Sequence, residues 1–273
     1  MVKKASAFER LLSEGFFASR EAALPYLMRG AVTCGGVPVR TGGQRVPIDA
    51  LLAVRGLNGR YIGKGGYKLE GAIRTFHVEV KGKFCIDAGA CTGGFTDCLL
   101  KHDAALVYAV DAGFGQLAGS LAQHPKVVNL EKTNLGDEKL LVLNPLPTLG
   151  SVDLSYLSLR KAVPQFRAVM HGQGELLCLV KPLFEVEDRL ARRTGSLRKD
   201  DYAPILLGLI AGLSAQEGTR ICGVTHSAVT GTGGTYEFFL HVRFGDVGHH
   251  SNSWEEAVRR AVECALALPR YRR

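Results

Sequence analysis

A glycine-rich segment that begins with an acidic residue is the most informative stretch of this chain. It covers residues 87–96 (Asp-Ala-Gly-Ala-Cys-Thr-Gly-Gly-Phe-Thr) and directly follows an apolar run. Its glycines have no Cβ atom, so the backbone can approach a ligand closely. A second apolar run ends in Asp111, about 20 residues later, where a carboxylate can accept hydrogen bonds from ribose hydroxyls. The pattern predicts a site for a nucleoside-containing cofactor, which we assign to Asp87, Gly89, Gly93, Gly94, Phe95, Asp111 and Asn134.

The order of residues in this loop narrows the class of cofactor. The loop lacks the Gly-x-Gly-x-x-Gly order of dinucleotide-binding turns. The loop also starts with a carboxylate. This disfavours a cofactor that contains a pyrophosphate, because a pyrophosphate binds to the free N–H groups of a helix N-terminus that has no acidic side chain beside it. An acidic start suits a cofactor with a cationic amino-acid group, such as S-adenosyl-L-methionine. The alternative is a plain tight turn between a strand and a helix, without a ligand.

Four charged residues stand beside apolar or glycine-rich segments. Asp153 and Lys181 each end an apolar run, Glu237 precedes one, and Lys68 follows a glycine pair. For each of them the alternative is a solvated strand end or an ordinary ion pair. Lys181 is the most unusual, because it ends a strongly apolar run at the place where ligands bind to parallel sheets. A lysine that is partly desolvated beside other cations can lose its proton near neutral pH.

Most of the excess positive charge lies in the first quarter of the chain. The formal net charge is +8, and residues 1–75 alone carry 12 basic and 5 acidic groups. A basic module beside a neutral remainder favours contact with a polyanion such as nucleic acid, with ordinary solubility charge as the alternative. A second basic stretch, 189–199, is either a mobile loop that touches phosphates or a solvated loop. The candidate RNA contacts are Arg10, Arg20, Arg29, Arg45, Arg193 and Arg198.

Capping and turn signals divide the N-terminal residues into two helices and short strands. Ser6 and Glu9 have capping-box spacing, and Ser19 can cap a second helix that ends at Gly30. Strands are expected at 31–34, 37–39 and 48–54. The glycine-rich and basic residues 59–66 are interpreted as a linker.

From residue 67 onward, strand-like and helix-like segments alternate. Strands are expected at 84–88, 106–110, 127–130, 175–180, 220–224 and 237–244, with helices that include 96–102 and 158–170. This alternation predicts an α/β domain with a mostly parallel sheet, whose ligands bind at the C-terminal ends of the strands. A further helix, with a capping box at Ser253 and Glu256, is expected in the tail.

Length and composition exclude several classes of protein. The 273 residues, 46% of them apolar, suit one large or two modest domains and exclude a disordered or low-complexity chain. No apolar run reaches the ~18 residues of a membrane span, and the start does not resemble a signal peptide. We therefore expect a cytoplasmic protein with no membrane contact. The seven cysteines and the histidines lack metal-ligand spacing, which favours free thiols and no metal site.

Together, these motifs resemble the TlyA family, whose members carry the historical name haemolysin A. Its members join an αL RNA-binding domain, of the ribosomal-protein-S-four type, to an FtsJ-like methyltransferase domain. The resemblance is carried by segments 65–72, 87–99, 108–111, 115–117, 153–159, 180–185 and 237–240. It implies an αL domain at 1–58, a linker at 59–66, a Rossmann-like class I methyltransferase domain at 67–248 and a helical tail at 249–273. The chain departs from the family at Ser6-Ala-Phe, Cys34-Gly-Gly and Gly63-Lys64, which bears on how RNA is held.

The resemblance also implies a reaction. Family members transfer a methyl group from S-adenosyl-L-methionine to the 2′-hydroxyl of ribose in ribosomal RNA, usually at cytidine. A Lys–Asp–Lys–Glu tetrad lines their site and falls on Lys68, Asp153, Lys181 and Glu237. We expect Lys181 to act as general base or to orient the hydroxyl, the two carboxylates to fix the lysines, and Lys68 to complete the network without a metal. The partner is then ribosomal RNA or a ribosomal subunit. Two rivals remain: a membrane-lysing protein, and an RNA-binding protein with an inactive methyltransferase domain.

Overall fold

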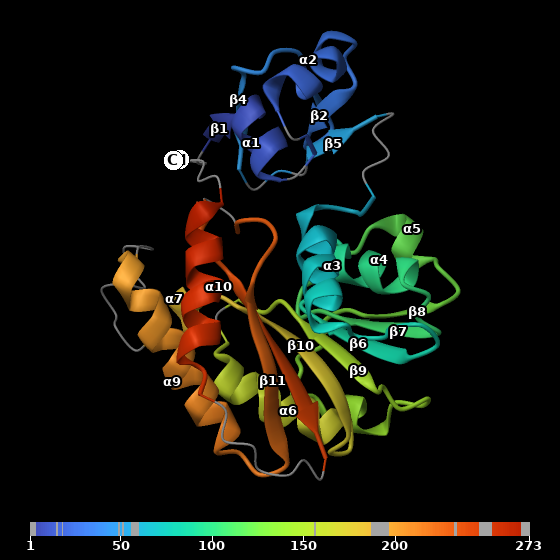
Figure 1. Cartoon of the computed structure of the whole chain (residues 1–273). Helices are drawn as coiled ribbons and strands as arrows, with labels where there is room; N and C mark the ends of the chain where they lie inside the picture. Colours follow the sequence, from blue (N-terminus) through green and yellow to red (C-terminus); the bar gives the residue numbers. More distant parts are fainter. Residues whose placement is uncertain are drawn as a thin grey trace.

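The computed structural model describes residues 4–14, 16–17, 19–48, 50, 52–55, 60–155, 157–186, 197–231, 234–245 and 253–268. These residues form a small N-terminal module and a larger α/β domain (Figure 1). Within the described ranges, no helix is long and apolar enough to cross a membrane.

The N-terminal module combines two short helices with two small sheets. Strands β3, β2 and β5 form an antiparallel sheet in that order, and β1 pairs with β4. Ser6 and Glu9 form the expected capping box, and Ser19 accepts a hydrogen bond from the Ala22 N–H. The last strand begins later than expected, at Leu52. The elements are β1 (Lys4–Ser6), α1 (Ala7–Ser13), α2 (Arg20–Met28), β2 (Val32–Cys34), β3 (Val37–Val39), β4 (Arg45–Pro47) and β5 (Leu52–Val54).

The larger domain is built on a seven-stranded sheet with the order β11-β12-β10-β9-β6-β7-β8. The five strands from β10 to β8 are parallel, while β12 runs antiparallel to both β10 and β11. The strands are β6 (Phe84–Ala88), β7 (Leu106–Val110), β8 (Val127–Leu130), β9 (Leu149–Val152), β10 (Gly174–Val180), β11 (Thr219–His226) and β12 (Phe238–Phe244). From β6 the chain adds strands first on one side and then, with β9, on the other. A crevice for a ligand is expected at such a switch point.

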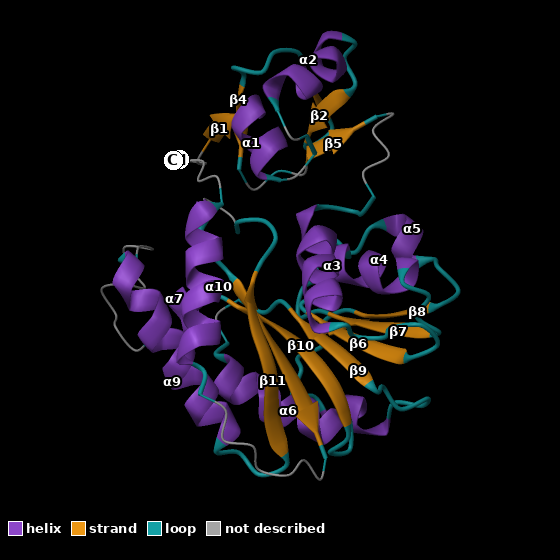
Figure 2. Ribbon diagram, in the orientation of Figure 1, coloured by secondary structure: helices purple, strands orange, loops and turns teal. Residues whose placement is uncertain are grey.

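Helices cover both faces of this sheet (Figure 2). On one face lie α3 (Lys64–Phe76), α4 (Gly94–Lys101) and α5 (Gly119–Ala122). On the other lie α6 (Leu159–Val169), α9 (Tyr202–Ser214) and α10 (Glu255–Ala267). Short helical turns complete the domain: η1 (Glu138–Val142), α7 (Pro182–Glu185) and η2 (Lys199–Asp201). Because both faces are covered, the central strands are largely apolar, and buried polar residues such as Asp87 and Ser151 are exceptions.

The structure confirms the expected strands 84–88, 106–110 and 127–130. Other elements differ from the expectation, among them α3, β9 and α10. Helix α3 begins at Lys64, so the end of the expected linker is helical. Strand β9 was not expected; it is short and contains Gly150, whose missing Cβ admits Leu176. The capping box before α10 does not form, because Ser253 donates to Glu255 instead of capping the helix. The buried face of α10 packs into the core beside β11 and α9.

Charged side chains form a cluster at the edge of the sheet where β10 begins. Glu175 accepts a hydrogen bond from His241 Nε2 at 2.8 Å and pairs with Lys83 Nζ at 3.2 Å. The hydrogen bond from His241 lowers the pKa of Glu175 to about 2, with help from the Lys83 charge and against the effect of burial. The ordinary value for a glutamate is 4.5.

We expect this cluster to make stability depend on acid. A carboxylate whose pKa is depressed by folding stabilises the protein fully above its unfolded pKa, and loses that contribution as pH falls through its folded pKa. Glu175→Gln should therefore be less stable than the wild type at pH 6, and the gap should close between about pH 4.5 and pH 2. Urea unfolding across this range measures the gap, with Glu217→Gln, in the exposed turn before β11, as control. A gap that stays constant with pH would contradict the assignment.

Candidate active site

The glycine loop after β6 owes its glycines to contacts with the protein itself. Gly89 has φ +84°, and a Cβ at this position would lie 2.4 Å from the carbonyl oxygen of Asp153. Gly93 has φ +98°, and its Cβ would lie 2.2 Å from a methyl group of Leu121. The first glycine thus lets the end of β9 approach the loop, and the second lets α5 approach it.

Asp87, which we assigned to the cofactor site, makes its side-chain contacts inside the protein. Its carboxylate is fully buried and accepts hydrogen bonds from Thr96 Oγ1 at 2.7 Å and Ser151 Oγ at 3.0 Å. Burial raises its pKa to about 7, although both hydroxyls oppose the shift. Asp87 therefore links β6 to α4 and to β9, and these hydrogen bonds help to hold the glycine loop in its conformation.

Gly94 and Phe95 also support the loop from behind. A Cβ on Gly94 would lie 3.1 Å from the Cα of Gly65, so this glycine permits the close packing of α4 on α3. The ring of Phe95 is buried in the core and stacks with Phe239, with 6.1 Å between ring centroids. The ring therefore contributes to the core, and the assignment of Phe95 to the cofactor site stays a prediction.

Asp111 fits the role predicted for it. The half-buried carboxylate accepts hydrogen bonds from the N–H groups of Cys91 in the loop and Gly113, both at 2.7 Å. A carboxylate offers about four acceptor positions, so two of them are left for ribose hydroxyls. Asn134 is exposed and follows Thr133, whose N–H donates to the Asp111 carbonyl. Both residues thus lie at the rim beside the loop.

The tetrad forms two ion pairs, of which the first is deeply buried. Lys68, on α3, pairs with Glu237 Oε2 at 2.5 Å, and the two side chains are 5% and 6% exposed. Burial lowers the pKa of Lys68, but the carboxylates of Glu237 and Asp153 outweigh it and leave the pKa raised. The buried lysine therefore stays charged because it has two acidic neighbours.

The second pair lies nearer the surface. Lys181 Nζ is 2.5 Å from Asp153 Oδ1, with the side chains 19% and 23% exposed. Burial acts to raise the pKa of Asp153, but the charges of Lys68 and Lys181 hold it below its ordinary value. Because Lys68 acts on Asp153 as well as on Glu237, the two pairs form one electrostatic unit. The structure thus brings all four predicted residues together, from α3 and the ends of β9, β10 and β12.

Lys64 is a site residue that the sequence analysis assigned to the linker. It lies one helical turn before Lys68 on α3, at the spacing that places two side chains on the same face. Burial, together with the charge of Lys68, lowers its pKa to about 8, against the effect of the nearby carboxylates. The signal in the sequence was the four-residue spacing of the two lysines.

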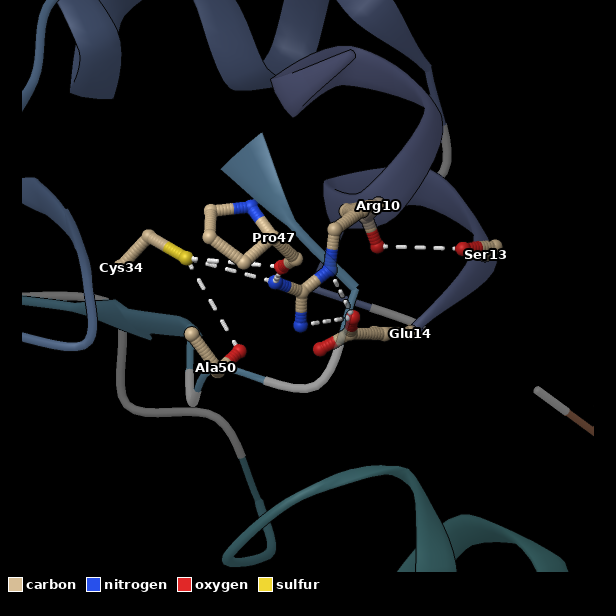
Figure 3. A network of polar contacts seen from close by, with 6 residues as sticks. All are labelled: Arg10, Ser13, Glu14, Cys34, Pro47 and Ala50. Carbon is tan, nitrogen blue, oxygen red and sulfur yellow. Dashed lines mark hydrogen bonds and ion pairs between the residues drawn. The ribbon is translucent and has the colours of Figure 1, made fainter. Parts of the chain in front are cut away.

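One predicted RNA contact, Arg10, is buried instead (Figure 3). Its guanidinium pairs with Glu14 at 2.5 Å, donates to Cys34 Sγ and donates to the carbonyl of Pro47. These bonds join α1 to β2 and β4, so Arg10 holds the module together and cannot bind RNA from its surface.

The other predicted RNA contacts are exposed where the structure describes them. Arg20 lies over the ring of Phe8 and Arg29 over that of Tyr26, at 5.6 and 3.8 Å from the ring centroids. Arg45 donates to the carbonyl of Lys4. Arg198 pairs with Asp201 at 3.0 Å. Arg193 falls outside the described residues.

The approach of Gly89 to Asp153 can be tested with a matched pair of variants. Gly89→Ala and Gly82→Ala both place an alanine at positive φ, which costs about 1–2 kcal/mol. Gly82 has open space around it, whereas at Gly89 the new methyl meets the Asp153 carbonyl. We therefore expect Gly89→Ala to lose about 1–3 kcal/mol more of the free energy of unfolding, as overpacking does. Urea unfolding measures the difference, and equal losses would show that the close contact is absent.

Comparison with known proteins identifies the methyltransferase family to which the chain belongs. The FtsJ-like methyltransferase family model matches residues 61–244. The 16S/23S rRNA (cytidine-2′-O)-methyltransferase TlyA of Mycobacterium tuberculosis is 33% identical over 264 residues, covering 96% of this chain and 98% of the relative. Hemolysin A of Brachyspira hyodysenteriae is 32% identical, covering 85% of this chain and 97% of the relative. A solved structure, described as a hemolysin from Streptococcus thermophilus, is 30% identical, covers 97% of both chains and has a TM-score of 0.76. The chain therefore belongs to the TlyA family of FtsJ-like methyltransferases.

Proposed function

We propose that this protein methylates the 2′-hydroxyl of a ribose, at cytidine, in ribosomal RNA, with S-adenosyl-L-methionine as methyl donor. The observation that carries the proposal is the convergence of Lys68, Asp153, Lys181 and Glu237 at the edge of the sheet where the parallel strands end. The M. tuberculosis relative, whose name states this chemistry, supports it.

The residues around the loop fit the proposed cofactor. Asp111 keeps acceptor positions for ribose hydroxyls, and its two bonds to backbone N–H groups hold it in place before anything binds. Asn134 and the exposed Cys91 lie at the same rim. When bound there, S-adenosyl-L-methionine supplies a methyl group on a positively charged sulfur.

Lys181 handles the proton in this proposal. A ribose hydroxyl is a poor acid, so its proton must leave as the oxygen attacks the methyl carbon. Lys181 is partly exposed, so its nitrogen is within reach of water and of the substrate hydroxyl, whose proton it takes in this proposal. Lys68 is too deeply buried for this role; its charge helps to keep Asp153 ionised, and it pairs with Glu237. Holding the hydroxyl in line with the methyl group provides a large part of the rate.

RNA binding is assigned mainly to the N-terminal module. The exposed arginines Arg20, Arg29 and Arg45 belong to the most basic part of the chain, and nucleic-acid affinity depends on such phosphate contacts. We propose that this module binds ribosomal RNA, within a ribosomal subunit or free, and presents it to the tetrad.

Substitution of Lys181 tests the catalytic assignment. Lys181→Ala should slow methyl transfer by at least ~10²-fold, the usual scale for a positioned proton transfer. Cofactor and RNA affinity should change little, because the loss concerns the transition state. Lys181→Arg should fail nearly as badly, since a guanidinium does not give up its proton.

The measurement is the single-turnover rate of 2′-O-methylation on ribosomal RNA, with cofactor and RNA saturating. Lys161→Ala, on the exposed side of α6, is the matched control. An arginine variant that stays nearly active would remove Lys181 from the role of base and leave it a phosphate or structural contact.

Two arginines of the module should respond differently to the same change. Arg20→Met should weaken RNA binding and reduce the salt slope by about one phosphate contact, with the fold intact. Arg10→Met should instead destabilise the module by roughly 3 kcal/mol, since it leaves Glu14 without its buried partner. Thermal unfolding and RNA binding at several salt concentrations separate the two effects. A stable Arg10 variant with a reduced salt slope would return Arg10 to the RNA surface.

A further inference from the structure

Lys181 has a second hydrogen-bond partner, Ser155, which does not belong to the tetrad. Its Nζ donates to Ser155 Oγ at 3.2 Å, in addition to the 2.5 Å contact with Asp153 Oδ1. Ser155 is exposed and lies in the segment between β9 and α6, two residues after Asp153. A serine hydroxyl next to a catalytic amine is accessible to any substrate that reaches that amine.

We propose that Ser155 is a positioning residue that aims the Lys181 amine at the substrate hydroxyl; the inference rests on the proposed 2′-O-methylation. A neutral lysine amine has two N–H bonds and one lone pair. Asp153 and Ser155 provide two acceptors, one for each N–H bond. With both bonds engaged, the lone pair has a single remaining direction, in which it accepts the proton of the 2′-hydroxyl.

The exposure of the two ion pairs and of Ser155 indicates from which side a substrate can reach the Lys181 lone pair. The pair of Lys68 and Glu237 is almost fully buried, the pair of Lys181 and Asp153 is about one-fifth exposed, and Ser155 is exposed. The Cys91 thiol, in the cofactor loop, lies close enough to Asp153 and Lys181 for both charges to act on its pKa, which burial raises overall. The amine is therefore close to both the cofactor loop and the exposed Ser155, and the proposal places the approach of RNA on the side of Ser155.

A second acceptor is needed because lysine is flexible. Its ammonium or amine ends a four-carbon stem with freely rotating N–H bonds, so one carboxylate alone leaves it free to turn about that single contact. Ser155 removes this freedom at small cost, because it is anchored to the same segment as Asp153.

The step balances without a further reactant. The 2′-oxygen forms a bond to the methyl carbon, the carbon–sulfur bond breaks with its electron pair passing to sulfur, and the hydroxyl proton passes to Lys181 Nζ. The ammonium formed donates to Asp153 and Ser155, as it does in this structure, and then returns its proton to water. Ser155 keeps its own proton throughout.

The experiment compares Ser155→Ala, Ser155→Thr and Ser158→Ala in single-turnover methylation of ribosomal RNA. Ser155→Ala should lower the rate at saturating RNA and cofactor about 10-fold, with the KM for RNA and the Kd for cofactor unchanged. Ser155→Thr keeps the acceptor and should recover to within about 3-fold of the wild type. Ser158→Ala removes a hydroxyl three residues further on, which donates to Glu185 at 2.6 Å. It should lower the melting temperature of the protein but leave the rate unchanged.

Two results overturn the inference when the wild type is active. One is a Ser155→Ala variant as fast as the wild type. The other is a slow variant that also binds cofactor or RNA weakly and that threonine does not rescue, since the serine would then only shape the loop. Failure of the proposed function is visible separately, as a wild-type protein that leaves no 2′-O-methylated ribose, and it would overturn this inference too.

Discussion

The contact between the backbone of Gly89 and the carbonyl of Asp153 is the constraint on which the active site depends. A side chain at residue 89 would lie 2.4 Å from that oxygen, so only glycine lets the ends of β6 and β9 come together. Below the contact, the buried Asp87 accepts a hydrogen bond from Ser151 of β9 and another from Thr96 of α4. The ends of β6 and β9, the glycine loop and the backbone of Asp153 are therefore fixed relative to one another.

Four charged groups can share one largely buried site because opposite charges offset the cost of burying each of them. A single buried ion would be strongly destabilising, but each of these has opposite charges next to it. Lys68 illustrates the balance, since its pKa is raised despite its burial because Glu237 and Asp153 both face it. Lys64 is a third cation beside the two ion pairs. Burial and the charge of the neighbouring Lys68 lower its pKa to about 8. The cluster thus combines two carboxylates with three lysines, of which Lys64 has the lowered pKa.

Much of this arrangement could be predicted from the sequence, for a physical reason. Strands buried on both faces appear as nearly continuous apolar runs, so 84–88 and 106–110 were found with their correct limits. The edge strand 127–130 was found as well, although none of its residues is fully buried. Strand β9 was missed because its four residues include Gly150 and Ser151, which serve the packing of Leu176 and the hydrogen bond to Asp87. The tetrad was predicted by its resemblance to a family, whereas its pairing depends on contacts between residues far apart in the chain.

Other roles depend on burial, which residue type alone does not reveal. Arg10 and Arg20 have the same side chain and lie in the same basic segment, yet one holds the module together and the other is exposed. Asp87 was assigned to the cofactor for its position at the start of the loop, and only the structure shows that its carboxylate bonds to the hydroxyls of Thr96 and Ser151 inside the protein.

The charge distribution separates recognition from chemistry. The tetrad contains two lysines and two carboxylates, so it has no net charge with which to attract a polyanion. Residues 76–245, which hold most of the larger domain, carry 17 basic and 17 acidic groups, so they add no net attraction either. We therefore expect the salt-dependent part of the affinity for RNA to come mainly from residues 1–75. A tetrad without net charge has a matching advantage, because four positive groups would bind phosphates in many positions, whereas transfer requires one ribose hydroxyl held in line.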